Sequence, residues 1–238
     1  MIDAFWFATT DLIFWGLTST YLTRFSIGFN LVVVFIGAII FWTVIQNAQR
    51  EINMPLLDEA WNRNLINLFT APISLIEFVI ATIILGLLKL ITVILLLGSL
   101  AYFLYRFNIF DYGWYLLPAL VNLTFIGWWV GFFIDGLIFR FGYKIQSFAW
   151  AFIFVLYPFS AVLYPVDILP HWAQTIAKLL PSSYIFENMR SVLLSGKFNP
   201  IDIQIAVTLN LIYLILSIYF LQLMFKNALA NGRLTKLN

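Results

Sequence analysis

The sequence alternates between long apolar runs and shorter polar segments. The apolar runs cover residues 4–22, 30–46, 74–105, 114–138, 145–164 and 201–225. Crossing the hydrocarbon core of a bilayer takes about 20 residues of helix, and each run is close to that length or exceeds it. The pattern therefore predicts an all-α membrane protein with six transmembrane helices, which together form a single membrane domain over residues 1–238.

The polar segment after the second run contains a short amphipathic pattern. Its apolar positions recur every three or four residues, at Leu57, Trp61, Leu65 and Leu68. Polar residues lie between them, as on a helix with one apolar face. Pro55 and Pro72 bound the pattern, because proline favours the limits of helices. We therefore expect a separate amphipathic helix over residues 57–69.

Residues 157–196 combine prolines with two amphipathic segments that are too polar to cross a membrane alone. Pro165 and Pro170 interrupt a helix, because proline lacks an N–H and its ring clashes with the preceding turn. Pro181 supplies another break, and Ser182 after it supplies a capping hydroxyl. The pattern predicts two short helices that lie in the membrane interface or dip into it.

Composition supports an integral membrane protein and excludes several classes of site. The chain is 63% hydrophobic and 10% charged, whereas soluble domains are about 45–50% apolar and about 25% charged. The absence of cysteine excludes disulfides and thiolate metal sites, and a single histidine leaves little for a metal cluster. A net charge of +2 is too small to indicate nucleic-acid binding. We therefore expect no metal site and no nucleic-acid partner.

Among the charged residues within the predicted spans, three are candidates for a functional role, namely Asp11, Lys89 and Asp135. A charge at mid-span costs about 2.5–3.5 kcal/mol on insertion scales, so such residues usually face a bundle interior or a cavity. We expect Lys89 to pair with Asp11 or Asp135, or to line the path of an anionic substrate. The alternative is that its amine reaches the membrane interface.

Glu187 and Arg190 stand three residues apart in the second short helix. They would therefore share a helix face and form an ion pair.

One motif order resembles that of a known family. A run ending in proline is followed by PV-x-x-LP-x-W, a second LP, F-E-x-x-R and a closing glycine. This order resembles the permease subunits of ABC-2 type exporters. The matching residues are Pro165, Val166, Leu169, Pro170, Trp172, Leu180, Pro181, Phe186, Glu187, Arg190 and Gly196. The resemblance implies that residues 165–196 form a re-entrant helical hairpin on the outer side, between the fifth and sixth spans.

The resemblance also implies partners and roles. Residues 57–69 would be a coupling helix that binds a separate ATP-binding cassette subunit, and the alternative is a helix that rests on lipid. The residues at that contact would be Asp58, Glu59, Trp61, Arg63 and Leu65. The permease would be a homodimer or pseudo-dimer embedded in lipid, with the path at its seam walled by residues such as Phe35, Trp42, Phe152 and Phe159.

ATP chemistry is expected on the partner. The phosphate-binding pattern G-x-x-x-x-G-K-[ST] does not occur in the sequence. No catalytic residue or cofactor is therefore expected on this chain, and ATP and Mg²⁺ would bind to the separate subunit. A proton-coupled secondary transporter is the alternative, with Asp11, Glu77, Lys89 and Asp135 as its relay, although neither repeated halves nor broken helices are apparent. An intramembrane enzyme would need a catalytic motif that the sequence lacks.

Charge distribution predicts the orientation. Six spans place both termini on one side, and basic residues are denser in the segments on that side. These are Arg50, Arg63, Arg140, Lys144, Lys226, Arg233 and Lys236. Cytoplasmic segments carry such an excess, so we expect a multi-pass protein of the inner (plasma) membrane with both termini in the cytoplasm.

Overall fold

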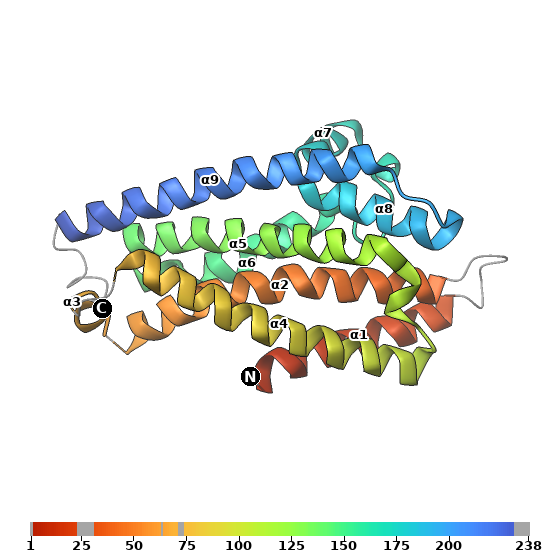
Figure 1. Cartoon of the computed structure of the whole chain (residues 1–238), viewed down its shortest axis with the longest axis horizontal. Coiled ribbons are helices and arrows are strands. Elements are labelled where there is room, and N and C mark those ends of the chain that lie inside the picture. Colours follow the sequence, from red (N-terminus) through yellow and green to blue (C-terminus); the bar gives the residue numbers. More distant parts are fainter. Residues whose placement is uncertain (1, 23–30, 63, 71–73, 231–238) are drawn as a thin grey trace.

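Long helices run side by side along the longest axis of the molecule (Figure 1). The computed structural model describes residues 2–22, 31–62, 64–70 and 74–230. The long helices are α1 (Ile2–Leu22), α2 (Leu31–Trp61), α4 (Leu75–Tyr105), α5 (Leu116–Phe141) and α9 (Pro200–Ala230). α5 lies between α2 and α9 and packs extensively against both, while α1 and α4 pack against α2.

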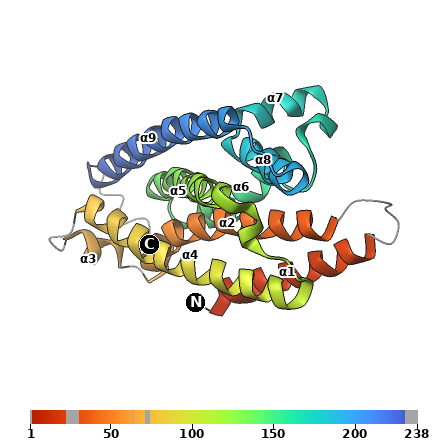
Figure 2. The ribbon, with the colours of Figure 1, turned by 45° about the vertical axis from the view of Figure 1, so that its right-hand side comes forward.

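Shorter elements gather at the two ends of the long helices. α3 (Leu65–Thr70) lies at one end, and α7 (His171–Leu179) and α8 (Pro181–Ser195) lie toward the other, beside the start of α9 (Figures 1 and 2). η1 (Ile109–Tyr115) connects α4 to α5. The remaining short elements are η2 (Tyr143–Ile145), α6 (Gln146–Leu156), η3 (Tyr157–Ser160) and η4 (Val166–Ile168).

Four helical segments in the described part of the chain are long and apolar enough to cross a membrane. They are Val32–Trp61, Leu75–Tyr105, Ile109–Phe141 and Pro200–Ala230. These segments contain most or all of the predicted second, third, fourth and sixth spans. α1 coincides closely with the predicted first span, but it does not belong to this set of four. A total of six spans therefore stays a prediction.

The predicted fifth span, residues 145–164, does not form one continuous helix. α6 contains 11 residues and continues into the 3₁₀ turn η3. Ala161 then adopts a left-handed conformation with φ 54°, which ends the helix. From Gln146 to Ser160 a helix reaches only about 22 Å, less than the roughly 30 Å of the hydrocarbon core. The chain folds back instead, and the Tyr164 hydroxyl donates to the Pro158 carbonyl at 2.7 Å.

The predicted separate helix over residues 57–69 is also corrected. α2 continues through Pro55 as far as Trp61, and α3 begins only at Leu65. Leu56 and Leu57 are each 1% exposed, so their packing keeps this stretch helical despite the N–H that proline lacks. The break comes after Trp61, where the Asn64 N–H donates to the Glu59 carbonyl at 2.9 Å.

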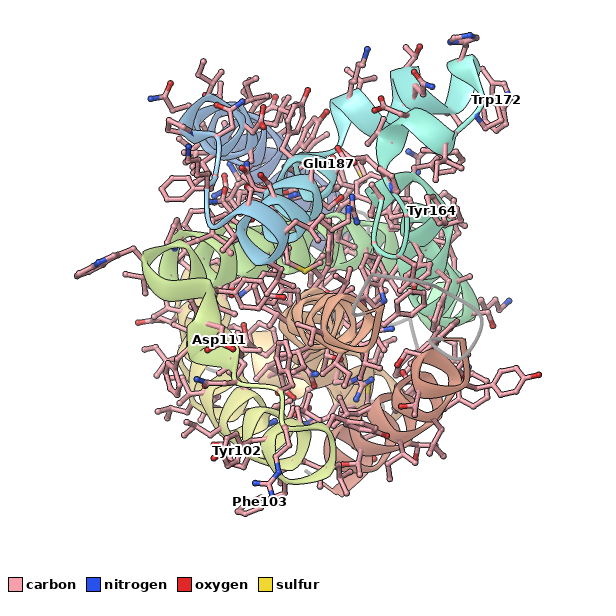
Figure 3. The ribbon with its side chains drawn as sticks, turned by 90° about the vertical axis from the view of Figure 1, so that its right-hand side faces the viewer. Tyr102, Phe103, Asp111, Tyr164, Trp172 and Glu187 are labelled. Atoms are coloured by element: carbon pink, nitrogen blue, oxygen red, sulfur yellow. The ribbon has the colours of Figure 1, made fainter. Side chains whose placement is uncertain are left out.

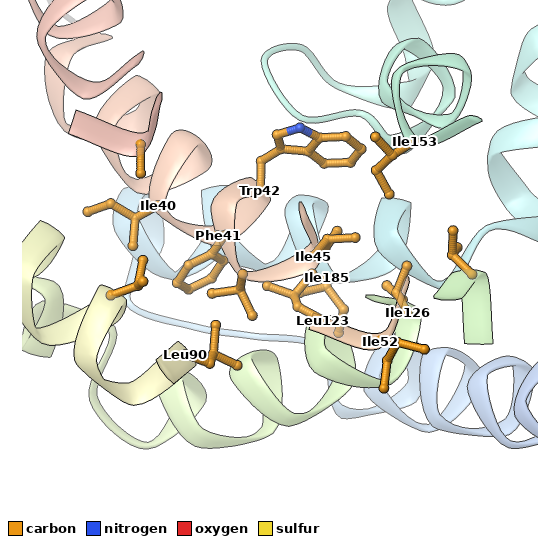
Figure 4. Close-up of a cluster of buried hydrophobic side chains, with 14 of the residues drawn as sticks. Ile40, Phe41, Trp42, Ile45, Ile52, Leu90, Leu123, Ile126, Ile153 and Ile185 are labelled. Atoms are coloured by element: carbon orange, nitrogen blue, oxygen red, sulfur yellow. The ribbon is translucent and has the colours of Figure 1, made fainter. Parts of the chain in front are cut away.

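The core is centred on the contact between α2 and α5. Figure 4 shows Ile45 of α2 packed against Leu123 and Ile126 of α5. Glycine allows the close approach: a Cβ added at Gly131 would lie 2.7 Å from the Cβ of Ile52. Small residues at such contacts are typical of helices packed within a membrane.

Candidate functional site

A buried guanidinium holds the irregular loop that follows η3. Arg190 Nη1 donates to the Ala161 carbonyl at 2.6 Å and to the Val162 carbonyl at 3.3 Å. Glu187 Oε1 accepts the Val166 N–H at 2.7 Å and lies 2.9 Å from Arg190 Nη2. The ion pair predicted from the three-residue spacing is therefore present, and it fixes both ends of the loop at residues 161–166. Figure 3 shows Glu187 on α8 and Tyr164 in this loop.

Charge compensation explains how Arg190 is tolerated inside the protein. Burial lowers the pKa of the Arg190 guanidinium, and the neighbouring Glu187 carboxylate opposes that shift. Two loop carbonyls and one carboxylate surround a side chain that is mostly buried. Removal of the Glu187 carboxylate would leave the buried Arg190 charge without its partner, which is far more costly than the loss of a surface pair.

The three prolines that are predicted to interrupt helices in this region lie at the starts of short helical elements. Pro165 precedes η4, Pro170 precedes α7, and Pro181 is the first residue of α8. α7 places its small residues, Ala173 and Ala177, against the protein. Its bulky apolar residues are exposed instead, at Trp172, Ile176 and Leu179, and Figure 3 shows Trp172 at the rim of the molecule. This arrangement suits a helix beside lipid, while re-entry into the membrane stays a prediction.

The predicted coupling residues lie around the end of α2. Trp61 is 44% exposed, and its indole Nε1 donates to Gln146 Oε1 at 2.7 Å. Asp58 is also exposed, whereas Glu59 Oε2 accepts a hydrogen bond from Asn64 at 2.6 Å. Leu65 is fully buried, so it supports the turn and offers no contact surface.

Arg63, the remaining predicted coupling residue, lies outside the described residues.

Lys89 pairs with Glu51, and not with Asp11 or Asp135 as predicted. The Lys89 Nζ lies 2.5 Å from Glu51 Oε2, which joins α4 to α2. Asp135 Oδ1 instead accepts a hydrogen bond at 2.7 Å from Asn53 Nδ2, which also donates to the Gly131 carbonyl at 2.8 Å. The structure therefore does not assemble Asp11, Lys89 and Asp135 into a proton relay.

We expect Lys89→Met to destabilise the protein by leaving the Glu51 carboxylate without its partner. The double variant Glu51→Gln/Lys89→Met should recover much of that loss, with a coupling energy within about 0.5–3 kcal/mol. Thermal unfolding of the four proteins in the same detergent measures the cycle. Additive losses in the two single variants would contradict an energetically significant pair.

Sequence reasoning missed several buried polar contacts. Asn210 of α9 donates from Nδ2 to Asn122 Oδ1 of α5 at 3.0 Å, and Trp129 Nε1 donates to Asn210 Oδ1 at 3.2 Å. Asparagines inside otherwise apolar runs were the available signal, because polar side chains often form hydrogen bonds between membrane helices. Glu51 gives no such signal, because it lies in the polar segment that follows the second apolar run.

A cleft of about 210 Å³ lies between α1, α2 and α6. We call it the α1/α2/α6 cleft. It is lined by Asp11, Trp15, Ile39, Trp42, Thr43, Gln46, Phe154 and Tyr157. The rings of Trp42 and Tyr157 meet edge to face with centroids 4.7 Å apart, and Figure 4 shows Trp42 on the side of α2 that faces Ile153 of α6.

The other suggested wall residues have separate partners. Phe35 packs against Trp15, Phe152 packs against Phe133 and Phe148, and Phe159 packs against Trp172.

The comparison with protein families identifies the family of the chain. The family model for the ABC-2 type transporter matches residues 2–194, which is most of the chain. The chain belongs to the ABC-2 type transporter family. The search of curated proteins gives no match. The matched range includes both the end of α2 and the Glu187–Arg190 pair.

Membership of the ABC-2 family sets the kind of protein. It is a multi-pass membrane permease and not a catalytic subunit, and permease domains of this family work with an ATP-binding cassette subunit. The polar contacts described above therefore serve the structure of a permease or its transport path, and not a catalytic site.

Proposed function

We propose that the chain is the permease subunit of an ATP-driven exporter and that it works as a homodimer. Two copies of a separate ATP-binding subunit bind ATP with Mg²⁺, and their closure moves the permease between inward-facing and outward-facing states. Family membership supports this proposal. The observation that carries it for this chain is the exposed Trp61, which donates a hydrogen bond to Gln146. This bond joins the end of α2 to the start of α6, and both helices line the α1/α2/α6 cleft.

That hydrogen bond suggests how motion reaches the path. Trp61 ends α2, and Gln146 begins α6. A partner that displaces the Trp61 ring therefore acts on both helices at once. α2 carries Trp42 and α6 carries Phe154, so a change in the angle between the helices alters the α1/α2/α6 cleft.

We place Trp61 and α3 on the cytoplasmic side of the inner membrane. Figure 1 places the end of α9 at the same end of the molecule as α3, which agrees with the predicted cytoplasmic carboxyl terminus. α7 and α8 then face the outer side, as the resemblance to ABC-2 permeases implies. Loop-by-loop accessibility labelling would test this orientation.

The proposed function is tested by purifying the tagged full-length chain in mild detergent. We expect a stoichiometric ATP-binding subunit to copurify from the native host. Trp61→Ala should reduce its recovery and the stimulation of its ATPase activity, because loss of an aromatic anchor at an interface typically costs about 2 kcal/mol or more. Absence of any ATP-binding protein from a folded preparation would overturn the proposal.

Gln146→Ala is the matched control for Trp61→Ala. It removes the same hydrogen bond but leaves the Trp61 ring exposed, so recovery of the partner should persist. Asp111→Asn serves as a second control, because Asp111 lies in η1, in the connection between α4 and α5. Equal loss of the partner in all three variants would show that Trp61 is no specific anchor.

A further inference from the structure

We propose that the α1/α2/α6 cleft binds the positively charged head group of an amphipathic organic cation, with the Asp11 carboxylate as its counter-ion. This inference rests on the proposed transport function, because it names the chemical class of the cargo. Three properties of the cleft carry it, namely its charge, its aromatic lining and its size.

Asp11 supplies the charge. It lies near the middle of α1, is exposed, and makes no hydrogen bond or ion pair with the rest of the described chain. A carboxylate at this depth is costly unless a cavity, a partner or a ligand compensates it. Among the described residues, no basic side chain lines the cleft, and Arg50 of α2 borders a separate small cavity with Trp150. The charge of the cleft therefore favours a cation.

Aromatic rings provide the second half of such a site. Trp15, Trp42, Phe154 and Tyr157 line the cleft together with Asp11. Ring faces attract cations through their quadrupoles, and quaternary ammonium groups are commonly bound by clusters of aromatic side chains. The edge-to-face contact with Tyr157 fixes the Trp42 ring before a ligand arrives, so little entropy is lost on binding.

The size of the cleft indicates which part of the ligand it holds. Its volume of about 210 Å³ is below the roughly 300–1,000 Å³ of pockets that enclose a whole small molecule. A head group fits, and an apolar tail would extend along the exposed surface beside it. Phe14 of α1 and Phe154 and Val155 of α6 are exposed there. The ligand is therefore amphipathic.

A larger cavity elsewhere lacks this selectivity. About 550 Å³ of space lies between α4, η1 and the start of α5, and its lining in the described part of the chain carries no charged side chain. Its lining is mainly apolar, with residues such as Ile94, Leu95 and Leu120. Such a surface accepts any apolar chain, whereas the α1/α2/α6 cleft discriminates by charge.

Calorimetric titration of the full-length protein with benzyltrimethylammonium tests the proposal in uncharged maltoside micelles. We expect one saturable site per chain and about tenfold weaker binding in Asp11→Asn, as the loss of one charge pair implies. Trp15→Leu should weaken binding about fivefold, whereas Trp15→Phe should retain most of it because the ring face remains. Asp111→Asn, a carboxamide change outside the cleft, should leave the dissociation constant unchanged.

Several outcomes would overturn the proposal. They are the absence of saturable binding, an unchanged dissociation constant in Asp11→Asn, and equal competition by neopentylbenzene, in which carbon replaces the charged nitrogen. A cleft covered by a second copy of the chain would give the first of these results. The titration needs no ATP-binding subunit, so its failure is distinct from a failure of copurification, which would overturn the proposed function instead.

Discussion

Arg190→Met is expected to lower the apparent melting temperature of the purified protein by about 10 °C. The Glu187 side chain is 36% exposed, so the loss of its charge partner costs less than the roughly 3–5 kcal/mol of a fully buried pair. The two loop carbonyls that lose their donor add about 1–3 kcal/mol each. For a chain of this size, each kcal/mol lowers the melting temperature by about 2–4 °C. The loss is large because a single guanidinium serves both loop carbonyls and the Glu187 carboxylate.

The structural reason lies in the conformation of the loop. Ala161 has a positive φ, which is unfavourable for a residue with a side chain. Its carbonyl accepts the shorter of the two Arg190 hydrogen bonds. Methionine fills similar space but donates no hydrogen bond, so the Ala161 and Val162 carbonyls would lose their donor and the loop would lose its main restraint.

Thermal unfolding followed by tryptophan fluorescence measures this effect, and limited proteolysis reports whether residues 161–166 become accessible. Glu187→Gln is the matched variant, because its amide oxygen still accepts the Val166 N–H. We expect it to lose less stability than Arg190→Met. A melting temperature for Arg190→Met within about 2 °C of the parent protein would contradict the assigned role, since that shift corresponds to under about 1 kcal/mol.

The Glu187–Arg190 pair also shows what local sequence can predict. Three-residue spacing on a helix brings two side chains together whatever the rest of the fold does, so the pair was predictable. The proline positions were predictable for a similar reason, because the ring restricts only its own neighbourhood. Long apolar runs predicted four helices, in the described part of the chain, that are long and apolar enough to cross a membrane. Each of these inferences depends on residues close together in the sequence.

The failed predictions depend on contacts between distant residues. Pro55 is predicted to mark the start of a separate helix, but buried Leu56 and Leu57 keep α2 continuous through it. The predicted fifth span ends at Ala161, where the carbonyl is held by a side chain 29 residues further along the chain. Hydropathy cannot reveal a bend imposed from that distance.

The prediction that Lys89 pairs with Asp11 or Asp135 failed for a related reason. Glu51 lies after the second apolar run in the sequence, so hydropathy does not single it out as a partner for Lys89. The continuous α2 places it beside Lys89, 38 residues away. Packing keeps α2 helical beyond residue 46. The same extension of α2 therefore explains both the longer helix and the pairing of Lys89 with Glu51.

The second large effect is expected at Gly127, where α5 meets α2. A Cβ added there would lie 2.4 Å from the Ala48 Cβ, 2.7 Å from the Ile45 carbonyl oxygen and 2.8 Å from the Gln49 backbone N. Two of these atoms belong to the backbone of α2, so the clash cannot be relieved by rotating a side chain. Gly127→Ala should therefore force the two helices apart.

Gly98→Ala provides a control with the same chemical change. Gly98 lies in α4, and a Cβ there would meet only Ile109 Cγ2 at 3.6 Å, an ordinary contact. Alanine is favoured over glycine in a helix by about 1 kcal/mol. We therefore expect Gly98→Ala to leave the melting temperature unchanged or raise it slightly.

The two variants should shift the melting temperature in different directions. Overpacking of a tight contact costs about 1–3 kcal/mol or more, which must exceed the helix-forming advantage of alanine for Gly127→Ala to destabilise. Because the clash involves the backbone of α2, we expect the cost of overpacking to exceed that advantage. At about 2–4 °C per kcal/mol, the melting temperature of Gly127→Ala should fall by about 5 °C. Thermal unfolding of both variants in one detergent decides the matter. Equal stability of Gly127→Ala and Gly98→Ala would mean that α2 and α5 can separate at little cost, and the close α2–α5 contact would then not be what fixes the core.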